Sequence, residues 1–144
     1  MRIAIASDHA GFIQKAPMVA YLQSLGHEVL DLGPDTDDRV DYPDYAEKVA
    51  RSVAAGESDY GVLICGTGIG MACAADKVAG IRAASIVTPQ FAALFREHNN
   101  GNVICLSGRF VELEVNEEIV STFLTTDFGG GRHEQRVAKI MALD

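Results

Sequence analysis

The feature that most constrains the fold of this chain is a regular alternation of short apolar runs with longer segments of helical spacing. The apolar runs predict strands at residues 2–7, 27–32, 60–65, 81–87 and 103–107. The helical segments cover residues 11–25, 45–54, 69–78, 89–97, 111–124 and 133–143. Such alternation is typical of a parallel sheet with helices on both faces. We therefore predict an α/β fold, a three-layer αβα sandwich with a doubly wound, five-stranded parallel sheet of the Rossmann-like type.

Two residues bear on the ends of the first predicted helix. Gly26 follows the last residue of helical spacing, as glycine does where a helix ends in a left-handed residue. Pro17 lies inside the segment, where it removes a backbone donor, so it predicts either a kink or a later start of the helix.

Length and charge limit the class of protein. The chain has 144 residues without a linker or repeat, so we expect one domain over residues 1–144. Its formal net charge of −8 argues against nonspecific nucleic-acid binding. No apolar run approaches the roughly 18 residues that span a bilayer, and the first residues soon become too polar for a secretory signal. We expect a cytoplasmic protein with no nucleic-acid or membrane partner.

In a doubly wound sheet, ligands bind beyond the carboxyl ends of the strands. The residues that follow the predicted strands are therefore the candidate site, and we expect them at one edge of the sheet. Their ionisable or amide side chains are Asp8, His9, Cys65, His98, Asn99 and Arg109.

Cys65 opens a loop with glycine at alternate positions, Gly66, Gly68 and Gly70. Glycines let backbone N–H groups approach a ligand closely, so the loop suits a phosphate or another oxyanion. It is not a dinucleotide fingerprint, because position 71 is Met, and no Lys-Ser or Lys-Thr pair makes it a Walker loop. No Arg stands six positions after Cys65, so the usual tyrosine-phosphatase loop is absent too. A tight strand-to-helix turn without a ligand is the alternative.

Three cysteines, with no C-x-x-C, argue against a disulfide framework and against a zinc site built on cysteines. A cysteine that ends an apolar strand is more often a structural core thiol. Cys65, however, lies beside a helix start, which favours the thiolate and suits it to act as a base or nucleophile. Cys73 and Cys105 lack this setting, and we expect both in the core.

Other candidate residues also have alternative explanations. Asp8 could cap the following helix, and His98 could complement the dipole of the helix that it ends. Arg132 and Arg136 are four residues apart, so they share a helix face that suits a phosphate or simply faces solvent. The glycines at 129–131 indicate a flexible or tightly turned arm before that helix.

Taken together, several motifs are specific although each alone is weak. They are Asp8-His9-Ala10-Gly11, Asp41-Tyr42-Pro43, Cys65-Gly66-Thr67-Gly68-Ile69-Gly70, His98-Asn99 and Gly130-Gly131-Arg132-His133. In this order and spacing, which cover essentially the whole chain, they resemble the ribose-5-phosphate isomerase B family. That family also includes galactose-6-phosphate and allose-6-phosphate isomerases.

The resemblance implies a reversible aldose–ketose isomerisation of ribose 5-phosphate and ribulose 5-phosphate, as in the pentose phosphate pathway. The reaction passes through a cis-enediolate and uses no metal or other cofactor. By analogy, Cys65 is the base that moves the proton between C2 and C1, and Thr67 assists proton movement between the sugar oxygens. Asp8 and His98 correspond to residues that bind and open the furanose ring.

The resemblance also implies the substrate contacts. The loop backbone and Asn99 would stabilise the enediolate, and Tyr42 would line the sugar site. The implied phosphate ligands are His9, Arg132, Arg136 and Arg109. One branch of the family uses a glutamate base at the position of Met71, which cannot ionise, so this chain resembles the cysteine branch.

Members of the family are homodimers or dimers of dimers with shared sites. The resemblance implies that the C-terminal helix reaches a partner subunit, and that the elements with His98-Asn99 and Arg132-Arg136 come from that partner. Two alternatives stay open: an isomerase of a six-carbon sugar phosphate, and a noncatalytic phosphate- or nucleotide-binding module on the same fold.

Overall fold

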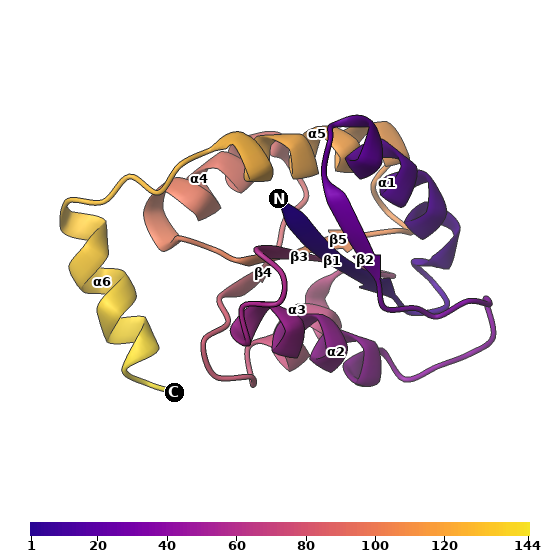
Figure 1. Ribbon diagram of the computed structural model, residues 1–144, viewed down its shortest axis with the longest axis horizontal. Coiled ribbons are helices and arrows are strands. Elements are labelled where there is room, and N and C mark those ends of the chain that lie inside the picture. The colour runs from indigo at the N-terminus through magenta and orange to yellow at the C-terminus, as the bar shows by residue number, and fades with distance from the viewer.

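The computed structural model describes all 144 residues, with five strands in one parallel sheet. The elements are β1 (Arg2–Ser7), α1 (Phe12–Ser24), β2 (Glu28–Asp31), α2 (Tyr42–Ala54), β3 (Tyr60–Cys65), α3 (Ile69–Ala75), β4 (Ala83–Ser85), α4 (Pro89–Asn99), β5 (Val103–Ser107), α5 (Leu113–Thr125) and α6 (Arg132–Met141). The strand order is β2-β1-β3-β5-β4, with helices on both faces (Figure 1). The predicted αβα sandwich is confirmed.

Both faces of the sheet are buried. Ile3 and Ile5 pack into the core under α1, α4 and α5, whereas Ala4 and Ala6 pack under α2 and α3 (Figure 1). This division arises because successive side chains along a strand point to opposite faces of the sheet, and here both the odd and the even positions are apolar. Gly61 in β3 leaves room for α2, because a Cβ there would stand 2.5 Å from Cγ1 of Val49.

The chain changes direction in the sheet between β1 and β3. From β1 it moves outward to β2, then crosses back to β3 and continues to the opposite edge. The crevice beyond the carboxyl ends of two such strands is where doubly wound sheets bind ligands. Ser7 pairs in register with Ile64, and the Asp8 N–H donates to the Ile64 carbonyl at 3.1 Å. Asp8 and Cys65 therefore leave the sheet from neighbouring strands.

The expected end of α1 at Gly26 is confirmed, whereas the alternative that Pro17 marks a later start of this helix is wrong. Gly26 has a φ of +89°, and the His27 N–H donates to the Leu22 carbonyl at 3.2 Å, which closes the helix in a Schellman arrangement. The helix begins at Phe12, so Pro17 lies inside it.

Two other elements differ in length from the prediction. α2 begins at Tyr42, three residues early, because Pro43 is compatible with the first turn of a helix. β4 is shorter than residues 81–87, because the Arg82 N–H donates to Oδ1 of Asn102 at 2.8 Å instead of extending the ladder.

The two remaining cysteines have different environments. Cys105 is fully buried, as expected, and burial raises the pKa of its thiol well above the ordinary value. Cys73 is exposed, so the expectation that it belongs to the core is wrong. On α3 the core side is taken by Met71, Ala72 and Ala75, and the helical period turns Cys73 away from it.

α6 lies outside the sandwich (Figure 1) and contacts both the end of α4 and the segment before β4, where Nη1 of Arg82 donates to Sδ of Met141 at 3.2 Å. Val137 is its one buried residue. Whether it reaches a partner subunit stays a prediction. No helix of the chain has both the length and the apolar character needed to cross a membrane.

Candidate active site

The Cys65 thiol is held by the loop that follows it. Its Sγ accepts the Gly68 N–H at 3.1 Å, and the residue is 5% exposed. Gly68 has a φ of +83°, and a Cβ there would stand 2.9 Å from Oγ of Ser85 and 3.1 Å from the Cys105 backbone. Only glycine fits this position, so the loop conformation that directs the N–H of residue 68 at the sulfur requires glycine there.

The same loop offers several unpaired donors. The backbone N–H groups of Gly66, Thr67, Gly70 and Met71 donate to no acceptor in the chain. Oγ1 of Thr67 accepts the Ile69 N–H at 3.2 Å, which leaves its own proton free to donate. The loop is therefore rich in donors at the carboxyl end of β3, as an anion or a developing oxyanion requires.

Backbone contacts join this loop to the one after β5. The Gly108 N–H donates to the Cys65 carbonyl at 2.7 Å, and the Arg109 N–H donates to the Gly66 carbonyl at 3.2 Å. The Arg109 side chain runs beside Gly66, where an added Cβ would lie 3.4 Å from Nη1. One cationic side chain of the same chain thus adjoins the glycine loop.

Asp8 and His9 lie where β1 turns into α1. Oδ1 of Asp8 accepts the N–H groups of Ala10 and Gly11, each at 2.9 Å, and Oδ2 has no partner. Asp8 thus braces the turn and is not the N-cap of α1, which is Gly11. Nδ1 of His9 accepts the Val40 N–H at 3.3 Å, so the neutral ring carries its proton on Nε2.

Tyr42 completes the group at this edge. Its ring, in the first turn of α2, packs against Gly70. The structure therefore brings together nine of the predicted residues: Asp8, His9, Tyr42, Cys65, Gly66, Thr67, Gly68, Gly70 and Arg109.

The other predicted residues lie elsewhere. His98 and Asn99 are in the last turn of α4, directly before β5 begins at Val103, so they lie at the amino edge of the sheet. The expectation that they share an edge with Cys65 is wrong within one chain. The physical reason is that a crossover helix starts at the carboxyl edge and returns the chain to the amino edge.

The amino edge has its own cluster of predicted site residues. The ring of His98 stacks on His133 of α6, with centroids 4.5 Å apart. The Gly129 N–H donates to the Glu97 carbonyl at 2.9 Å and holds the arm before α6 against α4. Arg132 and Arg136, both exposed, belong to this same helix. We call His98, Asn99, Arg132, His133 and Arg136 the amino-edge cluster.

His133 occurs in one of the motifs of the family resemblance, but no role was predicted for it, and its pKa is altered. Its pKa lies below the ordinary 6.5, first because of desolvation and then because of the positive charge of His98. Arg132 and Arg136 lower it further, and Glu97 opposes them.

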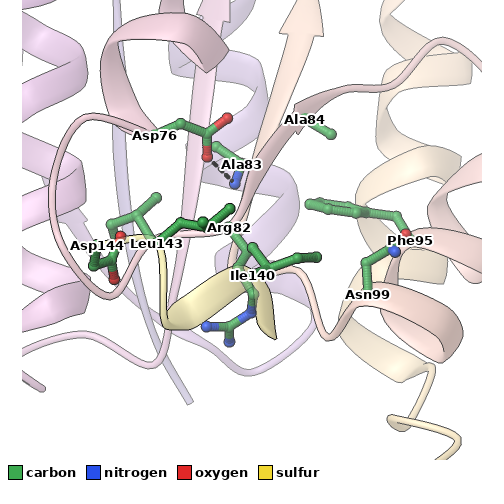
Figure 2. Close-up of a pocket in the computed structure, with 10 residues that line it drawn as sticks. Asp76, Arg82, Ala83, Ala84, Phe95, Asn99, Ile140, Leu143 and Asp144 are labelled. Atoms are coloured by element: carbon green, nitrogen blue, oxygen red, sulfur yellow. Dashed lines mark hydrogen bonds between the residues drawn. The ribbon is translucent and has the colours of Figure 1, made fainter. Parts of the chain in front are cut away.

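The cavities of the single chain do not include the Cys65 loop. The largest, about 440 Å³, lies at the amino edge between α4, the segment before β4 and the end of the chain. Figure 2 shows Asn99 and Phe95 on one side of it, Leu143 and Asp144 on the opposite side, and Ile140 near Arg82 between them. No group of three or more His, Cys, Asp or Glu side chains is placed to hold a metal ion.

Comparison with known proteins identifies the family. The sequence matches the model of the Ribose/Galactose Isomerase family over residues 3–140. The chain belongs to this family. Ribose-5-phosphate isomerase B of Escherichia coli (strain K12) is 48% identical over 143 residues, which are 99% of this chain and 96% of that protein.

Solved structures of the ribose/galactose isomerase family agree in fold. Ribose-5-phosphate isomerase B of Clostridium thermocellum has a TM-score of 0.98 and 45% identity, and the match covers 99% of this chain and 97% of that one. The Mycoplasma genitalium enzyme with bound ribulose-5-phosphate has a TM-score of 0.95 and 46% identity, covering 99% and 95%. The expected resemblance and the expected kind of enzyme, an aldose–ketose isomerase, are both confirmed.

Proposed function

We propose that this member of the ribose/galactose isomerase family interconverts ribose 5-phosphate and ribulose 5-phosphate, with Cys65 as the base. The observation that carries the proposal is the setting of Cys65. Its Sγ accepts an N–H at 3.1 Å at the end of β3, in a loop with unpaired donors. The relatives named for this reaction, and one solved with ribulose-5-phosphate, support the pentose substrate.

The reaction needs a base that serves two adjacent carbons and a partner for the charge on the intervening enediolate. The Cys65 thiolate takes the proton from C2 and returns it at C1. Thr67, whose hydroxyl proton is free, assists proton transfer between the two sugar oxygens. The loop N–H groups stabilise the negative oxygen, and since they are fixed before reaction they need no reorganisation.

Two copies of the chain are required to assemble every proposed group. Asp8, His9, Tyr42 and Arg109 lie beside Cys65, whereas His98, Asn99, Arg132 and Arg136 lie at the opposite edge. We propose a homodimer, or a dimer of dimers, in which the amino-edge cluster of one copy closes the Cys65 site of the other. The location of the two groups at opposite edges of the sheet and the outlying α6 support this arrangement (Figure 1).

In this assembly, Asp8 and His98 of the second copy bind and open the furanose ring, Asn99 adds a donor to the enediolate, and Tyr42 lines the sugar. The phosphate contacts His9, Arg109, Arg132 and Arg136. Local cations are necessary, because the net charge of −8 repels an anionic substrate at long range. The whole range 1–144 is one isomerase domain in this proposal.

The decisive test is Cys65→Ala in a coupled aldose–ketose assay, with Cys73→Ser as the matched control thiol. We expect Cys65→Ala to lower kcat by about 10²- to 10⁴-fold and to abolish exchange of the C2 hydrogen in deuterated water. Cys73→Ser should behave as wild type, because the thiol is exposed on the far side of α3. Turnover of Cys65→Ala near the wild-type rate would exclude Cys65 as the base.

The substrate is tested separately. Values of kcat/KM should be highest for ribose 5-phosphate among ribose 5-phosphate, allose 6-phosphate and galactose 6-phosphate. A higher value for a six-carbon substrate would replace the pentose assignment without affecting the role of Cys65. Absence of turnover and of C2 exchange with all three would favour a binding module.

A further inference from the structure

We propose that Gln14 and Asn116 are positioning residues for Arg109, acting through the loop of residues 107–111 between β5 and α5. Asn116 is fully buried and Gln14 is 8% exposed, in the core between α1 and α5. Neither side chain reaches the Cys65 loop. The inference rests on the proposed function in one respect, that Arg109 binds the substrate phosphate.

The two side-chain amides hold the loop through its carbonyl groups. Nδ2 of Asn116 donates to the Ser107 carbonyl at 2.9 Å and to Oε1 of Gln14 at 2.8 Å. Nε2 of Gln14 donates to the carbonyls of Val111 at 2.9 Å and Gly108 at 3.3 Å. Carbonyl groups before and after Arg109 in the loop are therefore hydrogen-bonded to buried amides of the core.

The orientation of both amides is determined by their partners. Backbone carbonyls accept and cannot donate, so the nitrogen of each amide must face the loop. Asn116 keeps this orientation although its Oδ1 is buried without a partner. Burial of an unpaired acceptor is unfavourable, so any stabilisation by the Asn116 side chain comes from the hydrogen bonds that its Nδ2 donates.

The upper side of the loop is tied to the active site. Oγ of Ser107 donates to the Gly66 carbonyl at 2.8 Å and accepts the Phe110 N–H at 3.0 Å. Together with the backbone contacts of Gly108 and Arg109, this leaves the loop little freedom. The buried amides thus complete a support that runs from the core to the glycine loop.

The side chain of Arg109 has no ion pair to fix its direction, so it depends on how the loop holds its backbone. It is exposed, and it belongs to none of the ion pairs of the chain. The direction in which the guanidinium leaves the protein is therefore set by the backbone of residue 109. A preorganised cation binds phosphate more tightly than one that must be ordered on binding.

The test is a double-mutant cycle between Asn116→Ala and Arg109→Ala, with KM for ribose 5-phosphate and competitive inhibition by inorganic phosphate as readouts. We expect Asn116→Ala to raise KM for ribose 5-phosphate and the inhibition constant for phosphate about tenfold each. The value of kcat should stay within about twofold, because the variant weakens phosphate binding in the ground state. In the Arg109→Ala background, Asn116→Ala should have no further effect, since the group that it positions is gone.

Ser52→Ala is the matched control for loss of a buried hydrogen bond. Its hydroxyl pairs with Ser58 at 2.8 Å, before β3 begins and away from the loop. It should lower Tm and leave KM and phosphate inhibition unchanged. If Asn116→Ala does not fold, Gln14→Leu replaces it in the same cycle, with the same expected result.

Several results would overturn the proposal. If the effects of Asn116→Ala and Arg109→Ala on KM were additive in the double variant, the amides would act independently of Arg109. A fall in kcat at constant KM would place their action on the Cys65 loop instead. If Arg109→Ala alone left KM unchanged, the phosphate role of Arg109 would be wrong, and the single variant would show this before the cycle is read.

Discussion

The ring of Tyr42 lies so close to Gly70 that a Cβ on residue 70 would stand 2.8 Å from Cζ of the tyrosine. Tyr42 belongs to the first turn of α2, and Gly70 to the first turn of α3. The third glycine of the loop thus makes room for an aromatic side chain beside the proposed sugar site. This gives Gly70 a role other than conformational freedom, since its φ is not positive.

Gly70→Ala should displace Tyr42 without unfolding the protein. Because Tyr42 is 42% exposed, the ring can swing into solvent, and alanine gains about 1 kcal/mol over glycine in a helix. We expect a change in unfolding free energy within about 1 kcal/mol and a rise in KM for the sugar phosphate. In a Tyr42→Ala background, Gly70→Ala should change KM no further. A rise of the same size in that background would show that the ring is not the cause.

Mixed dimers test the shared site. One inactive chain carries Cys65→Ala, and the other carries Arg132→Ala with Arg136→Ala, so each lacks groups at a different edge. Refolded together in equal amounts, they should recover about a quarter of wild-type activity, because half the dimers are mixed and each has one intact site. Each chain refolded alone is the control. No recovery, despite mixed dimers on native mass spectrometry, would mean that each site is built within one chain.

The ion pair of Lys15 and Asp31 should be asymmetric in its effect on stability. Nζ of Lys15 lies 2.7 Å from both carboxylate oxygens, but the lysine side chain is 6% exposed and the aspartate side chain 40%. Asp31→Ala leaves a buried ammonium unpaired and should cost about 3 kcal/mol, whereas Lys15→Met leaves a carboxylate that water reaches and should cost about 1 kcal/mol. Urea unfolding measures both. Equal losses would contradict the argument from burial.

His133 should make folding stability depend on pH. Its pKa is lowered from 6.5 by desolvation and by neighbouring positive charge, so the unfolded chain binds this proton more readily. Stability from this group is therefore complete above about pH 6.5 and declines as pH falls through the lowered pKa. His133→Asn should reduce the slope of Tm against pH between about pH 5 and 7. The wild-type chain measured in parallel is the control, and an unchanged slope in His133→Asn would contradict the prediction.

Local pattern was enough to predict the layers of this fold and the residues at the carboxyl edge. Strand periodicity is local, and all parallel strands end at the same edge, so Asp8, Cys65 and Arg109 could be placed together from their positions after strands. The glycine loop could be placed at the same edge, directly after β3. The family resemblance then supplied the chemistry that the pattern alone left open.

Tertiary structure decided what depends on where a helix takes the chain and on which side chains meet in the core. His98 follows a strand in sequence, but α4 carries it to the opposite edge, so sequence order misplaced it. Gln14 and Asn116 are 102 residues apart and were not singled out, because a buried amide looks ordinary until its partners are known. Cys65 could be selected from sequence as the candidate base, but only the fold shows the Gly68 N–H directed at its sulfur. Contacts between segments far apart in sequence depend on how the core packs, and the local periodicity of the sequence does not specify this packing.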